Sequence, residues 1–114
     1  MRFLVLGFDD TDTEAPARRQ AARAAHLDGV SALCDAGALH YAGALLDADG
    51  NMNGSMMVLE YPSEETLRTE FLANEPYVKG GVWTKIEVYP HTPAAFLEAG
   101  PPCWRAAICR GASK

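Results

Sequence analysis

The chain has 114 residues, 48% of them hydrophobic, and a formal net charge of −5 from 10 basic and 15 acidic side chains. This length and balance are typical of one globular domain and exclude intrinsically disordered and fibrous proteins. The acidic excess argues against a nucleic-acid partner, which would require a cationic surface. No apolar run approaches the roughly 18 residues that span a bilayer. Because Asp9 and Asp10 directly follow the short apolar start, we also expect no signal peptide, and we expect the protein to be cytoplasmic.

The spacing of apolar residues predicts six elements. In chain order we expect a strand over 2–8, a helix over 16–36, a strand over 38–46, a strand over 55–61, a helix over 64–73 and a strand over 82–89. The turn-forming residues 47–54 should join the second and third strands as a hairpin, and residues 74–81 should form a loop. The order β-α-β-β-α-β predicts an α+β, ferredoxin-like fold with a four-stranded antiparallel sheet and two helices on one face.

The second face of this sheet needs a cover, because both sides of the strands have apolar residues. Trp83, Tyr89, Met57 and Leu59 illustrate this, and two helices can cover only one face. Face-to-face packing of two copies is the simplest solution. We therefore expect a homodimer that forms an α+β barrel.

Residues 91–114 are expected to be a C-terminal extension of a domain that spans residues 1–90. Residues 92–99 could form a short helix and residues 104–108 a short strand. The three cysteines Cys34, Cys103 and Cys109 fit no common zinc spacing, so we expect reduced thiols, with Cys34 a small core residue of the first helix.

His26 is the most informative polar residue of the first helix. It shares one face with Ala22, Gly29 and Leu33, whereas Arg18, Arg19 and Arg23 should largely populate other faces. Two interpretations remain open for His26. It is either a core histidine whose nitrogens bind backbone or water, or a general acid/base, because imidazole titrates near neutrality.

A histidine base works better when a carboxylate fixes its tautomer. Glu75, in the loop before the last strand, and Asp9, at the end of the first strand, are the candidates. Glu75 could equally be solvated and Asp9 could be a turn residue, since spacing alone places neither beside His26.

Several local patterns together resemble the YCII-related (YciI-like) family. They are Arg23-x-x-His26-Leu27, Gly37-Ala38-Leu39-x-x-Ala42-Gly43-Ala44-Leu45, Asp49-Gly50-x-x-x-Gly54-Ser55 and Asn74-Glu75-Pro76-Tyr77-Val78-x-Gly80-Gly81-Val82-Trp83. They occur in the family's order over residues 1–90, most of the chain. The resemblance implies a ferredoxin-like subunit that dimerises into an α+β barrel, in agreement with the element order.

The resemblance also implies an active site made of a first-helix histidine and an aspartate in an Asp-Pro-Tyr/Phe loop. His26 matches the histidine, and Glu75 stands where the family usually has aspartate. The extra methylene shifts the carboxylate by roughly one bond length, which either preserves or detunes the pair. Asp9 matches an acid often found at the end of the first strand in relatives.

Four further residues are candidates for substrate binding: Tyr77, Trp83, Gly80 and Ser55. Aromatic residues in such positions are more often core or interface, and the Gly80–Gly81 pair more often serves backbone geometry. No metal site is expected, because His26, His40 and His91 lack ligand spacing to one another. No phosphate loop or dinucleotide motif is present, so no cofactor is expected.

These observations favour a cofactor-free isomerase or lyase that acts on a small cyclic or aromatic substrate, possible elimination chemistry included. His26 would be the acid/base, Glu75 would orient it, and Asp9 would be a second acid or a polar anchor. The alternatives are a non-catalytic dimeric domain that binds a small ligand or partner and, more weakly, a cofactor-free oxygenase.

Overall fold

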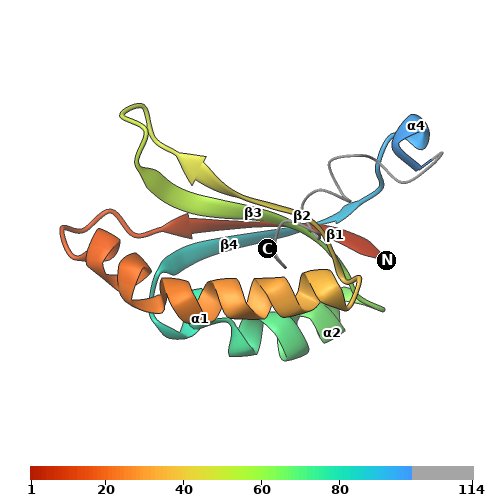
Figure 1. Ribbon diagram of the computed structural model, residues 1–114, viewed down its shortest axis with the longest axis horizontal. Helices are drawn as coiled ribbons and strands as arrows, with labels where there is room; N and C mark the ends of the chain where they lie inside the picture. The colour runs from red at the N-terminus through yellow and green to blue at the C-terminus, as the bar shows by residue number, and fades with distance from the viewer. Residues whose placement is uncertain (99–114) are drawn as a thin grey trace.

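The computed structural model describes residues 1–98 as an open sheet with its main helices on one side (Figure 1). The strands are β1 (Arg2–Asp9), β2 (Leu39–Leu46), β3 (Met52–Glu60) and β4 (Trp83–His91), all paired antiparallel in the order β2-β3-β1-β4. The helical segments are α1 (Ala15–Asp35), α2 (Glu64–Thr66), π-helical η1 (Leu67–Phe71), 3-10 η2 (Leu72–Asn74), α3 (Pro76–Lys79) and α4 (Ala95–Glu98). The predicted ferredoxin-like α+β fold is confirmed.

The element limits differ from the predicted ones at three places. β3 begins at Met52 rather than at residue 55, because the turn before it closes over residues 47–51, with Gly50 at a φ of 86°. The helix predicted over 64–73 is one helical stretch, but it changes hydrogen-bonding pattern within η1 and η2. The predicted loop 74–81 contains the short helix α3. The short C-terminal helix α4 lies within the expected 92–99, and Cys103, Trp104 and Cys109 lie outside the described residues.

The core lies between the sheet and the helices. Alternation along β1 turns Phe3 and Val5 to the helical side, where they pair with Leu59 and Met57 of β3. Leu67 of η1 packs on the same cluster and is fully buried. This sheet face therefore supports α1 and the stretch from α2 to α3, which together hold the polar residues described below.

Trp83 lies on the helical side of β4, a departure from the predicted alternation with Ile86 and Val88. The register of β4 against β1 shifts between Phe8 and Asp9, so that Trp83 pairs with Asp9. The Trp83 ring then lies against Gly7, where a Cβ would come within 2.4 Å of it. Glycine at position 7 is what admits the indole to this layer.

The opposite sheet face is apolar. Leu4, Leu6 and Phe8 alternate onto it from β1, and Met56 and Val58 lie beside them on β3. Trp83, Met57 and Leu59, which we expected to illustrate a second apolar face, instead all lie on the helical side.

Two further observations complete the fold. Cys34 is buried in the core as predicted, but it is disulfide-bonded rather than reduced. No helix among the described residues is long and apolar enough to cross a membrane.

Substitution of Gly7 by alanine should destabilise the protein by about 1–3 kcal/mol, because the added methyl group overlaps the Trp83 ring. Urea unfolding followed by circular dichroism measures this loss. Gly29→Ala is the matched control: no atom lies within 4 Å of a Cβ there, and alanine should stabilise helix α1 by about 0.5–1 kcal/mol. Equal stability of the Gly7→Ala and wild-type proteins would contradict the described packing of Trp83.

Candidate active site

Glu75 is held in place by the helix that it begins. It is the N-cap of α3, with extended backbone (φ −71°, ψ 125°), and Pro76 follows in the first turn. Its Oε1 accepts the backbone N–H of Tyr77 at 3.1 Å. The carboxylate therefore has a fixed position and is buried, with only 4% of the residue exposed.

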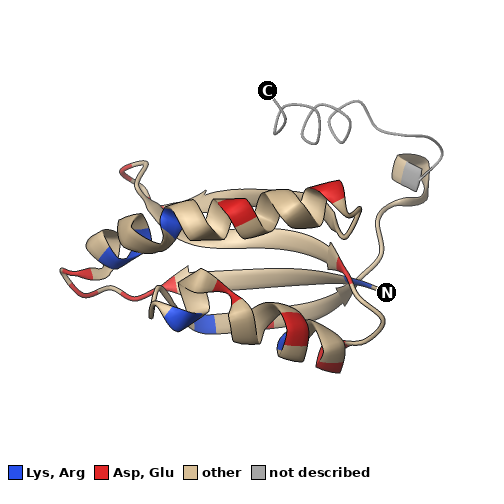
Figure 2. Cartoon of the chain, turned by 60° about the horizontal axis from the view of Figure 1, so that its bottom comes forward, with Lys and Arg blue, Asp and Glu red and all other residues tan. Residues whose placement is uncertain are grey.

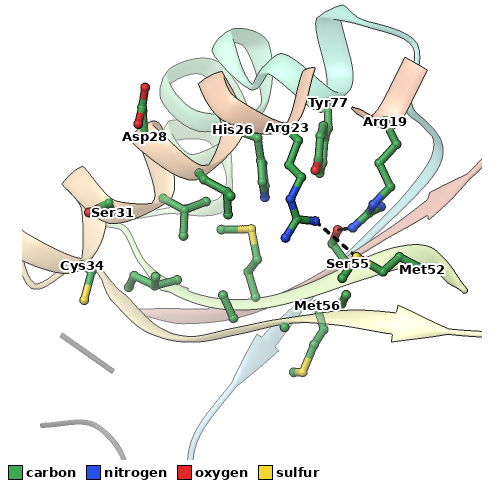
Figure 3. Close-up of a pocket in the computed structure, with 17 residues that line it drawn as sticks. Arg19, Arg23, His26, Asp28, Ser31, Cys34, Met52, Ser55, Met56 and Tyr77 are labelled. Carbon is green, nitrogen blue, oxygen red and sulfur yellow. Dashed lines mark hydrogen bonds between the residues drawn. The ribbon is translucent and has the colours of Figure 1, made fainter. Parts of the chain in front are cut away.

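The same carboxylate oxygen bonds His26. Nδ1 of His26 lies 2.6 Å from Oε1 of Glu75, and His26 is only 8% exposed. A proton on Nδ1 satisfies this bond and leaves Nε2 of the neutral ring as an acceptor. Nε2 has no hydrogen-bond partner among residues 1–98. Figure 3 shows the His26 ring pointing from α1 into a cavity.

Two aromatic rings fix the plane of the imidazole. Tyr77 stacks on His26 with ring centroids 3.9 Å apart and an interplanar angle of 10°. Trp83 meets both rings edge-on, at 5.8 Å from His26 and 5.5 Å from Tyr77. Burial raises the pKa of the Tyr77 phenol above its usual value, so this ring stays neutral beside the histidine.

A second buried network adjoins the first. Nη1 of Arg19 lies 2.9 and 3.0 Å from the two carboxylate oxygens of Asp9. Nη2 of Arg19 donates to the carbonyl oxygen of Gly54 and to Oγ of Ser55, both at 3.2 Å. The indole N–H of Trp83 also donates to Oγ of Ser55, at 3.2 Å. The guanidinium lies over the Tyr77 ring at 4.9 Å and so links the two networks.

A cavity of about 580 Å³ opens between α1 and the β2–β3 hairpin, beside His26. Its walls are mainly apolar, with Val30, Ala42 and Met57 among them, whereas His26, Ser55 and the two arginines Arg19 and Arg23 are polar. This volume suits a small ring compound. Within residues 1–98, no three histidine, cysteine or acidic side chains gather as metal ligands do.

The structure brings most of the predicted site residues together. His26, Glu75, Tyr77 and Trp83 form one contact cluster, and His26, Tyr77 and Ser55 line the cavity. Asp9 bonds Arg19 and not His26. Gly80 is the C-cap of α3 and does not line the cavity. A Cβ at Gly80 would come within 2.9 Å of the Pro76 carbonyl oxygen, so its role here is backbone geometry.

Arg19 and Arg23 were wrongly assigned to other faces of the first helix. Arg19 is 8% exposed, and both side chains line the cavity beside His26. Positions 19, 23, 26 and 30 follow the same 4-3-4 spacing that identified the histidine face, so the sequence did contain the signal. Their charge outweighed their spacing in the prediction.

Comparisons with known proteins place this geometry in context. The model of a family described as the YCII-related domain matches residues 1–92. A solved structure of 5-chloro-2-hydroxyhydroquinone dehydrochlorinase (TftG) from Burkholderia phenoliruptrix AC1100, in complex with 2,5-dihydroxybenzoquinone, is similar with a TM-score of 0.72 and 24% identity. The match covers 84% of this chain and 98% of that one.

An uncharacterized NIPSNAP domain protein from Burkholderia xenovorans matches less well, with a TM-score of 0.44 and 16% identity over 84% of this chain and 97% of that chain. No curated protein matches the sequence significantly.

Replacement of Asp9 by asparagine should cost about 3–5 kcal/mol of unfolding free energy, because it leaves the buried Arg19 charge uncompensated. Urea unfolding measures the loss. Asp12→Asn is the matched control, since Asp12 also pairs with an arginine of α1, Arg18, but at an exposed position, and its loss should be far smaller. Equal losses in the two variants would show that the Asp9–Arg19 pair does not support the fold.

Proposed function

The chain belongs to the YCII-related family, and from this premise we propose that it is a small-molecule enzyme that transfers protons through His26. The substrate is a small cyclic or aromatic compound, and the reaction is an isomerisation or an elimination. The observation that carries this proposal is the 2.6 Å contact between Nδ1 of His26 and Oε1 of Glu75, beside a cavity that the imidazole lines.

The geometry supports an acid/base role in three ways. Glu75 holds the proton on Nδ1 and stabilises the imidazolium that forms when Nε2 accepts a proton. Tyr77 and Trp83 hold the ring plane, so that Nε2 is already oriented before a substrate binds. The apolar walls reduce solvation of the cavity and strengthen electrostatic interactions within it.

The proposed step is balanced without an oxidant or reductant. An O–H or C–H bond of the substrate breaks, an N–H bond forms at Nε2, and the electron pair stays on the substrate. That pair then forms a new double bond. In an elimination it expels a leaving group with its own bonding pair, and in an isomerisation His26 returns the proton to another atom.

The dehydrochlorinase named above supplies a first substrate class to test. Its name states loss of chloride from a chlorinated hydroxyhydroquinone, and its complex contains a hydroxyquinone. Both are small ring compounds of the kind that a cavity of about 580 Å³ accommodates. We therefore extend to this chain the elimination of a leaving group from a hydroxylated ring.

Glu75 acts in this proposal as a positioning residue, and its longer side chain takes the place of the family's aspartate. The carboxylate lies in hydrogen-bond contact with His26 because the N-cap position brings its backbone close to α1. Asp9 serves as the anchor of Arg19 rather than as a second acid, since both of its oxygens contact that guanidinium.

We further propose that two copies pack through the apolar sheet face to form the α+β barrel. Leu4, Leu6 and Phe8 form the centre of this face, and the exposed rings of Tyr41 and Tyr89 lie on flanking strands. Light scattering on the full chain should give twice the 12.3 kDa monomer mass. A mass near that of one chain at micromolar concentration would rule out the dimer.

His26→Gln should lower turnover of chlorinated hydroxyhydroquinones or of another ring substrate found by screening by about 10²–10⁴-fold. Chloride release or ring absorbance measures the rate. His40→Gln is the matched control, because His40 forms the same kind of pair with Glu60 at 2.9 Å but does not line the cavity. Unchanged turnover in folded His26→Gln protein would refute the catalytic role.

Glu75→Gln keeps an oxygen that can cap α3 but removes the negative charge from His26. We expect kcat to fall by more than tenfold while the thermal unfolding midpoint changes by only a few degrees, and we expect Glu75→Asp to recover part of the rate. A parallel loss of stability and rate would instead indicate that Glu75 serves the fold alone.

A further inference from the structure

The cavity contains a positive charge that the fold does not neutralise. Figure 2 shows that the N-terminal half of α1 is basic, whereas its acidic residues lie further along the helix. Arg18 pairs with Asp12, and Arg19 pairs with Asp9. Arg23 has no acidic partner within the described residues.

The single polar contact of Arg23 is a weak one. Its Nη1 lies 3.3 Å from Sδ of Met52, and a thioether is a poor hydrogen-bond acceptor. Asp28 is the one acidic residue that lines the cavity, but Figure 3 shows its carboxylate turned away from the Arg23 guanidinium. The remaining hydrogen-bond donors of Arg23 are therefore available to a ligand.

Arg23 and His26 face the same space. They are three residues apart on α1, which places them on one side of the helix. Figure 3 shows both side chains projecting from α1 toward the β2–β3 hairpin, with Tyr77 behind them. A ring compound against the apolar wall would thus meet an imidazole and a guanidinium together.

We propose that Arg23 binds an anionic oxygen of the substrate, so that the cavity selects cyclic compounds with a phenolate, enolate or carboxylate group. This inference rests on the proposed function for its site and deepens it by naming the substrate class. A guanidinium suits such an oxygen because its charge is permanent and its donors form charge-assisted hydrogen bonds. The same cation stabilises the negative charge that develops when His26 removes a proton.

The test is a binding measurement that does not depend on turnover. Calorimetry with full-length protein compares 2,5-dihydroxybenzoquinone with its neutral dimethyl ether, and benzoate with benzamide. The wild-type protein should bind the anionic member of at least one pair tighter by at least about tenfold, or about 1.4 kcal/mol. Preference confined to the hydroxyquinone assigns the site to phenolate-type oxygens, and preference for benzoate extends it to carboxylates.

Arg23→Gln should abolish this preference and leave affinity for the neutral compounds unchanged, whereas Arg23→Lys should retain most of it. Arg18→Gln is the matched control, since it removes an arginine of the same helix that does not line the cavity. The inference is overturned if the wild type shows no preference for either anion, or if Arg23→Gln keeps the preference. It is also overturned if Arg23→Gln weakens the anion and its neutral partner equally.

Comparison with the His26 variant separates this inference from the proposed function. His26→Gln that loses turnover while Arg23→Gln keeps full anion affinity would leave the enzyme proposal intact and refute the anion site. Anion affinity that depends on Arg23, in a protein whose turnover survives His26→Gln, would refute the proton transfer and leave the anion site intact.

Discussion

One carboxylate joins the two halves of this site. Oε1 of Glu75 accepts both the N–H that begins α3 and the Nδ1 proton of His26 on α1. These two elements are far apart in sequence, so the bond is formed only when the helical layer has packed on the sheet. The orientation of the imidazole is therefore a property of the whole fold rather than of α1.

Around this bond, burial and polarity are balanced by mutual satisfaction. Arg19, Asp9 and Ser55 are polar groups in a layer that is otherwise apolar, and each meets a partner there. Buried networks of this kind are costly when one member is lost, and they define a single arrangement of their neighbours. The Trp83 indole belongs to both networks, through its ring and its N–H. The site is thus rigid on the Glu75 side and has its one uncompensated charge, that of Arg23, on the cavity side.

The sequence predicted the parts that depend on periodicity and missed those that depend on contacts between elements. Apolar spacing was sufficient for the strand order and for the histidine face of α1. It could not show that Trp83 changes sides, because that follows from a register shift against β1. It also misplaced Arg19, because a buried arginine is expected only where a partner such as Asp9 is known to be near. The pairing of Glu75 with His26 was anticipated from the family resemblance, whereas its capping of α3 was not.

The π-helical turn of η1 has a consequence for how this site tolerates changes in chain length. The N–H of Leu72 reaches the carbonyl oxygen of Leu67, five residues earlier, so this turn holds one more residue than a regular helical turn. Deletion of that residue would tighten the turn and rotate everything after it by about 100°. Glu75, only three residues beyond Leu72, would swing away from the imidazole although no side chain of the pair had been altered. The number of residues between Ser63 and Glu75 is thus as much a determinant of this centre as the identity of the acid.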